Sequence, residues 1–178
     1  MVATLQRPHL SPQEYLEWEA YQSTRHEYIG GEVYAMTGGT IPHSEIAVNM
    51  TTLLKTHLRG RGCRILSSDA KIGITDDGPF FYPDASVTCD PRDRTALKFA
   101  RYPSLIAEVL SPTTEAYDRG NKFAQYRRLD SLKEYVLISS NSVNVEVFCL
   151  NQNGKWEFTS YGEGDEVHLT SVDLTVAI

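Results

Sequence analysis

Two carboxylates and one lysine in the middle of the chain have the residue types and order of a hydrolytic site. Asp84 follows Pro83 at the start of one apolar run, Glu108 lies inside the run SLIAEVL, and Lys122 follows in a helix-like segment. A carboxylate among apolar neighbours is costly to keep ionised unless a cation meets it. We therefore expect Glu108 to have a positively charged partner.

The same residues have the chemistry of a metal site. Both faces of the strand around Glu108 are apolar, which is typical of a central, covered strand, while Pro83 favours an irregular and accessible position for Asp84. Two acids at the ends of neighbouring strands can bind a hard divalent cation, and a nearby lysine can hold a reacting water or an anionic oxygen. The pattern favours a metal-dependent phosphodiesterase; a purely structural salt-bridge cluster is the alternative.

Further polar residues near two expected turns are candidates for the same site. Glu27 and Glu32 flank the glycine pair 30–31, and one of them, Glu32 in preference, is expected to add an acid; otherwise both are solvated charges beside a turn. His43 follows Pro42 at a helix start. It either caps that helix or contacts phosphate or water near the site.

The elements that must position these residues can be read from capping signals and apolar spacing. Ser11, Pro12 and Glu14 give a helix start, and the glycine pair indicates a hairpin. Helices are expected over about 12–21, 43–58 and 115–129, with β runs between them and at the C-terminal end. The third helix places Asp118, Lys122 and Tyr126 on one face. The expected fold class is α/β or α+β with a mixed central sheet flanked by helices.

Composition limits the remaining choices. The chain has 178 residues, 41% of them apolar, and shows no repeat or linker, so one domain over 1–178 is expected. The net charge of −6 argues against non-specific binding of nucleic acid over the whole surface, although the segments 57–64 and 119–133 are locally basic. No apolar run approaches the roughly 20 residues of a membrane span, and no signal-peptide core is seen, so a cytoplasmic location without membrane attachment is expected.

The cysteines and the missing motifs add little chemistry. Cys63, Cys89 and Cys149 lack metal-type spacing and are expected to be small buried hydrophobes. Walker, GxGxxG, HExxH, GxSxG and CxxC motifs are absent from the sequence, which weakens nucleotide, zinc-protease, hydrolase and zinc-ribbon interpretations.

Six ordered motifs resemble the Uma2 family of bacterial, notably cyanobacterial, proteins. They are EYIGGEV at 27–33, HS at 43–44, YPD at 82–84, EVLSP at 108–112, DRGNKFxxY at 118–126 and LKEYVLI at 132–138. The resemblance covers about residues 10–138. It implies a restriction-endonuclease-like fold of the PD-(D/E)XK superfamily, with a core of helix, three antiparallel strands, helix and strand.

The resemblance also implies roles for the chemical residues. Asp84, Glu108 and the backbone carbonyl of Val109 would bind Mg²⁺, or Mn²⁺ in its place. The superfamily's usual lysine position, two residues after the second acid, holds Leu110 here. Lys122 on the following helix is the expected substitute, because its long stem can bring the ammonium to the same point.

The expected function is therefore Mg²⁺-dependent endonucleolytic cleavage of DNA with Asp84, Glu108, Lys122, Glu32 and His43 at the site. The alternative is a catalytically inactive nuclease-fold protein that acts in nucleic-acid binding or protein assembly. A homodimer is also expected, because the β runs from Asn144 onward supply more strand than the nuclease core requires.

Overall fold

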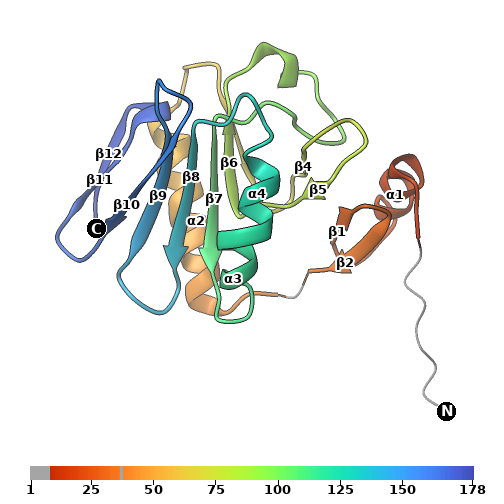
Figure 1. Cartoon of the computed structure of the whole chain (residues 1–178), viewed down its shortest axis with the longest axis horizontal. Coiled ribbons are helices and arrows are strands. Elements are labelled where there is room, and N and C mark those ends of the chain that lie inside the picture. Colours follow the sequence, from red (N-terminus) through yellow and green to blue (C-terminus); the bar gives the residue numbers. More distant parts are fainter. Residues whose placement is uncertain (1–8, 37) are drawn as a thin grey trace.

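A six-stranded mixed sheet forms the centre of the molecule (Figure 1). The computed structural model describes residues 9–36 and 38–178. All neighbouring strands of this sheet are antiparallel except β7 and β8, which are parallel. The strands lie in the order β10 (Trp156–Tyr161), β9 (Val145–Leu150), β8 (Glu134–Ser139), β7 (Leu105–Leu110), β6 (Ala85–Thr88) and β3 (Arg64–Ser67).

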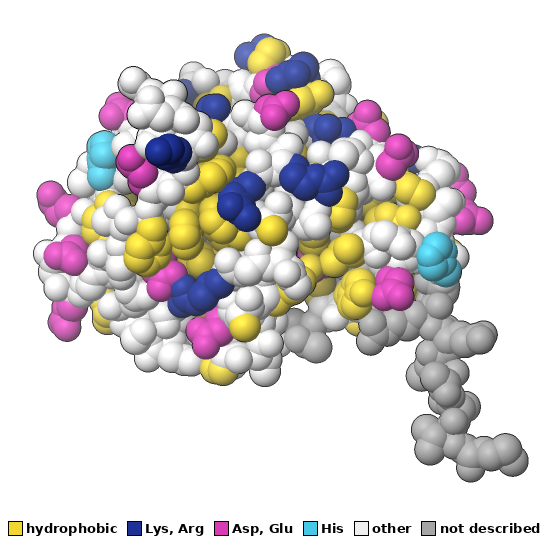
Figure 2. Space-filling model, in the orientation of Figure 1, with side chains coloured by type: hydrophobic (Ala, Val, Ile, Leu, Met, Phe, Trp, Pro, Cys, Tyr) yellow, Lys and Arg dark blue, Asp and Glu magenta, His cyan; other side chains and the backbone are white. Residues whose placement is uncertain are grey.

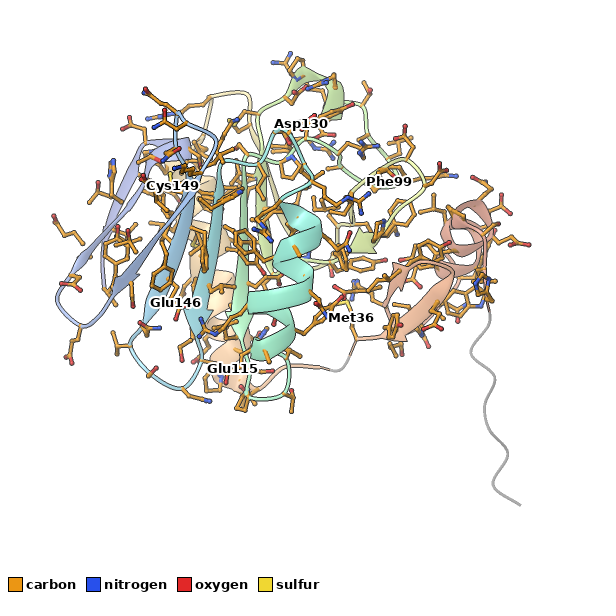
Figure 3. The ribbon with its side chains drawn as sticks, viewed as in Figure 1. Met36, Phe99, Glu115, Asp130, Glu146 and Cys149 are labelled. Carbon is orange, nitrogen blue, oxygen red and sulfur yellow. A yellow bond between two sulfur atoms is a disulfide. The ribbon has the colours of Figure 1, made fainter. Side chains whose placement is uncertain are left out.

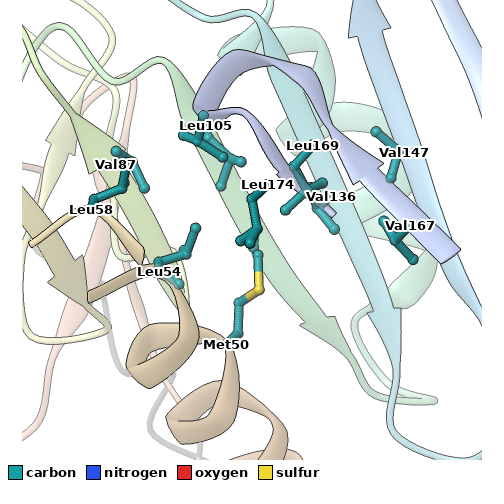
Figure 4. Close-up of a cluster of buried hydrophobic side chains, with 13 residues drawn as sticks. Met50, Leu54, Leu58, Val87, Leu105, Val136, Val147, Val167, Leu169 and Leu174 are labelled. Atoms are coloured by element: carbon teal, nitrogen blue, oxygen red, sulfur yellow. The ribbon is translucent and has the colours of Figure 1, made fainter. Parts of the chain in front are cut away.

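Helix α2 (Ile41–His57) covers one face of this sheet. Its Met50 and Leu54 pack with Val87 of β6 and Leu105 of β7 (Figure 4). The C-terminal hairpin of β11 (Glu166–Leu169) and β12 (Leu174–Ala177) covers the rest of the same face. Buried Glu134 fastens this hairpin to β8, since its carboxylate accepts hydrogen bonds from the backbone and hydroxyl groups of Thr170 and Ser171.

The opposite face of the sheet carries one helical segment in three parts. α3 (Glu115–Tyr117) leads into a π-helical turn (Asp118–Lys122), and α4 (Phe123–Tyr126) follows directly. Phe123 and Tyr126 pack against Ile106 of β7 and Tyr135 of β8. The two sides of the sheet therefore have separate hydrophobic clusters, and β7, buried along its whole length, lies between them.

A smaller sheet stands beside the large one, at the right of Figure 1. Its order is β2 (Glu32–Ala35), β1 (His26–Ile29), β5 (Phe80–Phe81) and β4 (Ile72–Gly73). Gly30 and Gly31 turn the β1–β2 hairpin with φ angles of 59° and 97°, as the sequence predicts. Since β5 leads directly toward β6, this sheet brings the hairpin close to the start of the central strands.

Most of the expected helices are confirmed, with shifted ends. α1 (Pro12–Glu19) begins with the predicted capping box, and α2 begins two residues before His43 because Thr40 supplies the cap. The third helical segment ends at Tyr126 rather than near Leu129, and its π turn was not foreseen. Within the described ranges, no helix is long and apolar enough to cross a bilayer.

The expectation for the cysteines is wrong for two of the three. Cys63 and Cys89 form a disulfide with their Cα atoms 4.1 Å apart. The cause is the register of β3 and β6, which pairs Arg64 with Thr88 and so sets the two neighbouring cysteines opposite each other. Cys149 is a free, half-buried thiol.

Candidate functional site

The pairing of β6 with β7 brings Asp84 and Glu108 together. The register matches Ala85 with Ala107, so the residue before β6 lies opposite Glu108. The Asp84 N–H donates to Glu108 Oε2 at 3.4 Å, and the Val109 N–H donates to Asp84 Oδ2 at 2.8 Å. The two carboxylates therefore lie next to each other where β6 begins, as the sequence predicts.

Lys122 is the cation that Glu108 requires. Its Nζ lies 2.9 Å from Glu108 Oε1, 3.1 Å from Glu27 Oε1 and 3.6 Å from Asp118 Oδ1. The lysine itself is only 6% exposed, and Glu108 is 4% exposed. The expectations that Glu108 has a cationic partner and that Lys122 reaches it from the helix are both met in this geometry.

The π turn explains how the lysine reaches the sheet. π turns occur mostly as single turns inside α-helices, often at functional sites. Here Lys122 and the next residue, Phe123, are both buried, so the wider turn faces two consecutive side chains toward the sheet. At the usual lysine position on β7, Leu110 is buried in the hydrophobic cluster that includes Phe123.

Tyr126 adds a hydrogen bond to Glu108. Its hydroxyl donates to Glu108 Oε1 at 3.0 Å, while the Tyr135 hydroxyl donates to the carbonyl of Asp118 at 3.0 Å. Both rings are fully buried. The contact of Tyr126 with the acid was missed, although its position four residues after Lys122 was a signal for it.

Burial dominates the electrostatics of the cluster. Desolvation raises the pKa of Glu108 to about 8, with Asp84 and Asp118 acting in the same direction and Lys122 against it. Burial also disfavours the ammonium of Lys122, yet its three acidic neighbours raise its pKa well above the ordinary value. The lysine therefore stays charged, and three carboxyl groups contact one ammonium.

Of the two hairpin acids, Glu27 is the one that joins this cluster. Besides its ion pair with Lys122, its Oε1 accepts a hydrogen bond from the Tyr82 N–H at 3.3 Å. Glu32 points elsewhere: it is exposed on β2 and accepts a hydrogen bond from Tyr34. The two acids are five residues apart, on either side of the hairpin turn, and the sequence alone does not show which of them faces the cluster.

His43 lies on the more exposed side of the cluster. Its Nε2 is 3.4 Å from Asp84 Oδ2, and the two side chains are 19% and 14% exposed. The hydrogen bond to Asp84 raises the pKa of His43, while burial acts against this shift. His43 is thus a neighbour of the metal-type acids at the place where solvent reaches them.

The oxygen atoms at this edge suit a hard cation. Asp84 and Glu108 offer carboxylate oxygens, and the backbone of Val109 lies beside them, with its N–H donating to Asp84. Among residues 9–36 and 38–178 there is no group of three or more His, Cys, Asp or Glu arranged to hold a metal. Two protein carboxylates fit Mg²⁺, because this ion usually takes one or two carboxylates and completes its shell with water and substrate phosphate.

The fold has a counterpart among solved nuclease-like proteins. A crystal structure from Anabaena variabilis, described as "a putative nuclease belonging to DUF820", superimposes with a TM-score of 0.76 at 17% identity, over 94% of each chain. At that identity the comparison shows a shared fold.

Sequence comparison gives the family. The Uma2 family model, described as "Putative restriction endonuclease", matches residues 12–177, and the chain belongs to this family. Protein slr1290 of Synechocystis sp. is 47% identical over 171 residues, which cover 96% of this chain and 90% of that protein. Protein sll1609 of the same organism is 32% identical over 169 residues, covering 93% and 95%.

Proposed function

We propose that the protein is a Mg²⁺-dependent endonuclease that cleaves DNA, with Asp84, Glu108 and the Val109 carbonyl as metal ligands. Membership of the Uma2 family supports the nuclease class. The observation that supports a metal ion at this site is the number of acidic groups. Glu27, Glu108 and Asp118 all contact one lysine, and Asp84 lies next to Glu108. Such a concentration of negative charge attracts a divalent cation. Mn²⁺ is expected to substitute for Mg²⁺.

In this proposal each residue of the site has a separate role. The bound cation supplies activation of water and neutralisation of charge on the scissile phosphate. Lys122 and Tyr126 both contact Oε1 of Glu108 and so fix the orientation of this carboxyl group. His43, beside Asp84, is placed to contact phosphate or water at the exposed side. Glu27 holds the lysine from the hairpin.

Metal-dependent cleavage tests the proposal directly. Purified protein incubated with supercoiled plasmid is expected to nick or linearise it in millimolar Mg²⁺, and EDTA is expected to stop the reaction, with recovery on adding Mg²⁺ or Mn²⁺. Agarose gels over time give the rate. The same assay with single-stranded DNA tests a second form of the substrate. Cleavage that continues undiminished in EDTA would contradict the metal role.

A second candidate, an inactive nuclease fold that binds nucleic acid or a protein, has its own support. The ammonium of Lys122 is held by three carboxylates and is almost fully buried, so it has little freedom to meet a substrate. Leu110 occupies the usual lysine position. Salt-sensitive DNA binding without turnover in either metal would favour this alternative.

We also propose a homodimer in the cytoplasm, built on the strands after Asn144. β10 is an edge strand, and Phe158 on it is 56% exposed beside Phe148 of β9. Figure 2 shows hydrophobic side chains gathered over this part of the face. Edge strands with apolar side chains favour pairing with another chain. Sedimentation velocity is expected to show a dimer that Phe158→Asp dissociates; a monomer at all concentrations would refute it.

A further inference from the structure

A cavity lies at the opposite end of β7 from Glu108. Its volume is about 390 Å³, within the range of small-molecule sites. Ser104, just before β7, lines it and is four residues from Glu108, which corresponds to about 13 Å along a strand. In Figure 3 Asp130, another lining residue, lies beyond the end of α4, whereas Glu115 marks the other end of the helical segment. The cavity is therefore separate from the carboxylate site.

Three arginines from three different segments line this cavity. Arg92 comes from the 3-10 turn after β6, Arg101 from the loop before β7, and Arg128 from the loop after α4. Two acids, Asp90 and Asp130, also line the cavity, and Asp76 forms an ion pair with Arg101. In Figure 2 several Lys and Arg side chains lie on the upper part of this face.

Arg92 is already paired with other residues that line the cavity. Its guanidinium pairs with both oxygens of Asp90 and lies 3.5 Å from the ring centre of Tyr102. The hydrogen bonds from Arg92 hold the pKa of Asp90 at about 2, so the acid stays ionised and neutralises this arginine. Arg101 is likewise ion-paired, with Asp76, so among the three arginines Arg128 is the one without an acidic partner in the described part of the chain.

Arg128 and Arg101 retain donors for a ligand. Arg128 donates to the neutral amide oxygen of Gln125 at 2.6 Å, and no ion pair joins it to an acid among the described residues. Arg101 donates to Asp76 through Nη1, but its buried Nε has no hydrogen-bond partner in the described part of the chain. A buried donor without an acceptor is costly. An anion that accepts from Arg101 would remove that cost.

We propose that this cavity binds the phosphate group of a nucleotide, either free or within a nucleic-acid strand. Guanidinium groups match phosphate oxygens with paired N–H donors, which is why arginine is common at phosphate sites. Arg128 and Arg101 donate to the phosphate, and the serines at 104 and 131 line the same space. This site stands independently of the metal site, because it needs neither Asp84 nor Mg²⁺.

The test is binding by metal-free protein, followed through backbone amide shifts in NMR. Inorganic phosphate and adenosine monophosphate are each titrated into wild type, Arg128→Gln and Lys55→Gln. Wild type is expected to show saturable shifts at residues 89–92, 101–104 and 128–131. Arg128→Gln should weaken binding about tenfold, as expected for loss of one charged hydrogen bond. Lys55 is an exposed cation on α2, across the sheet, so Lys55→Gln should bind like wild type.

A labelled single-stranded oligonucleotide distinguishes the two sources of the phosphate. Weaker oligonucleotide binding by Arg128→Gln than by Lys55→Gln assigns the cavity to a strand; equal binding with phosphate binding retained assigns it to a free nucleotide. No shift at these residues with either small probe overturns the proposal, as does equal weakening in both variants. Arg128 is exposed and bonds only one side chain, so its variant should fold normally. Loss of DNA cleavage alone leaves this result unchanged, which separates it from the proposed nuclease.

Discussion

Replacing Lys122 with methionine should lower the free energy of unfolding by about 3–5 kcal/mol, the usual cost of removing one partner from a buried charge cluster. The side chain is almost fully buried and is the shared partner of Glu27, Glu108 and Asp118. Methionine fills a similar volume, so the loss reports the charge rather than a cavity. Urea unfolding followed by circular dichroism gives the value.

Two companion variants make the Lys122 result specific. Lys55→Met, on the exposed face of α2, should change the free energy of unfolding by less than about 0.5 kcal/mol. Adding Glu108→Gln to Lys122→Met should restore part of the loss at a pH above the Glu108 pKa of about 8, where the acid it removes would be ionised and uncompensated. The loss should also shrink at acid pH, since protonated carboxyl groups need no ammonium. A change below about 1 kcal/mol in Lys122→Met would show that the cluster is not held by this lysine.

The conversion of Asp84 to asparagine is expected to reduce Mg²⁺-dependent DNA cleavage by about 100-fold or more, a loss of about 2.7 kcal/mol of transition-state stabilisation. Asparagine keeps an oxygen that can accept from the Val109 N–H, so the β6–β7 edge should stay intact. What it loses is the charge beside Glu108 and the pairing with His43.

The matched control for Asp84→Asn is Glu163→Gln, which removes one charge at an exposed position between β10 and β11. Gel assays of both variants should show loss in the first and full activity in the second. Thermal unfolding should give similar midpoints for both, so that a folding defect is not mistaken for a catalytic one. Equal cleavage by Asp84→Asn and wild type would remove Asp84 from the site.

Much of the site could be predicted from local sequence because burial makes strong demands. Glu108 stands in a run so apolar that it needed a cation, and Lys122 was available on the next helix; the structure pairs them at 2.9 Å. Pro83 correctly indicated that Asp84 would precede its strand. The glycine pair fixed the β1–β2 hairpin because few other residues adopt positive φ angles without strain.

What could not be predicted depends on three-dimensional register. Which of Glu27 and Glu32 faces inward follows from how the hairpin packs beside β5, and no local pattern contains that packing. The Cys63–Cys89 disulfide follows from the pairing of β3 with β6. The arginine-lined cavity draws its residues from three separate loops, so it exists only once the sheet has formed.

Asp84 and Glu108 are proposed to form a divalent-cation site. Isothermal titration of Mg²⁺ and Mn²⁺ into wild type and Asp84→Asn tests it most directly, because it needs no knowledge of the DNA substrate. We predict one saturable site per chain in wild type and its loss in the variant. Equal binding by wild type and variant would place the metal elsewhere, and no binding to wild type in the presence or absence of a DNA oligonucleotide would contradict the claim.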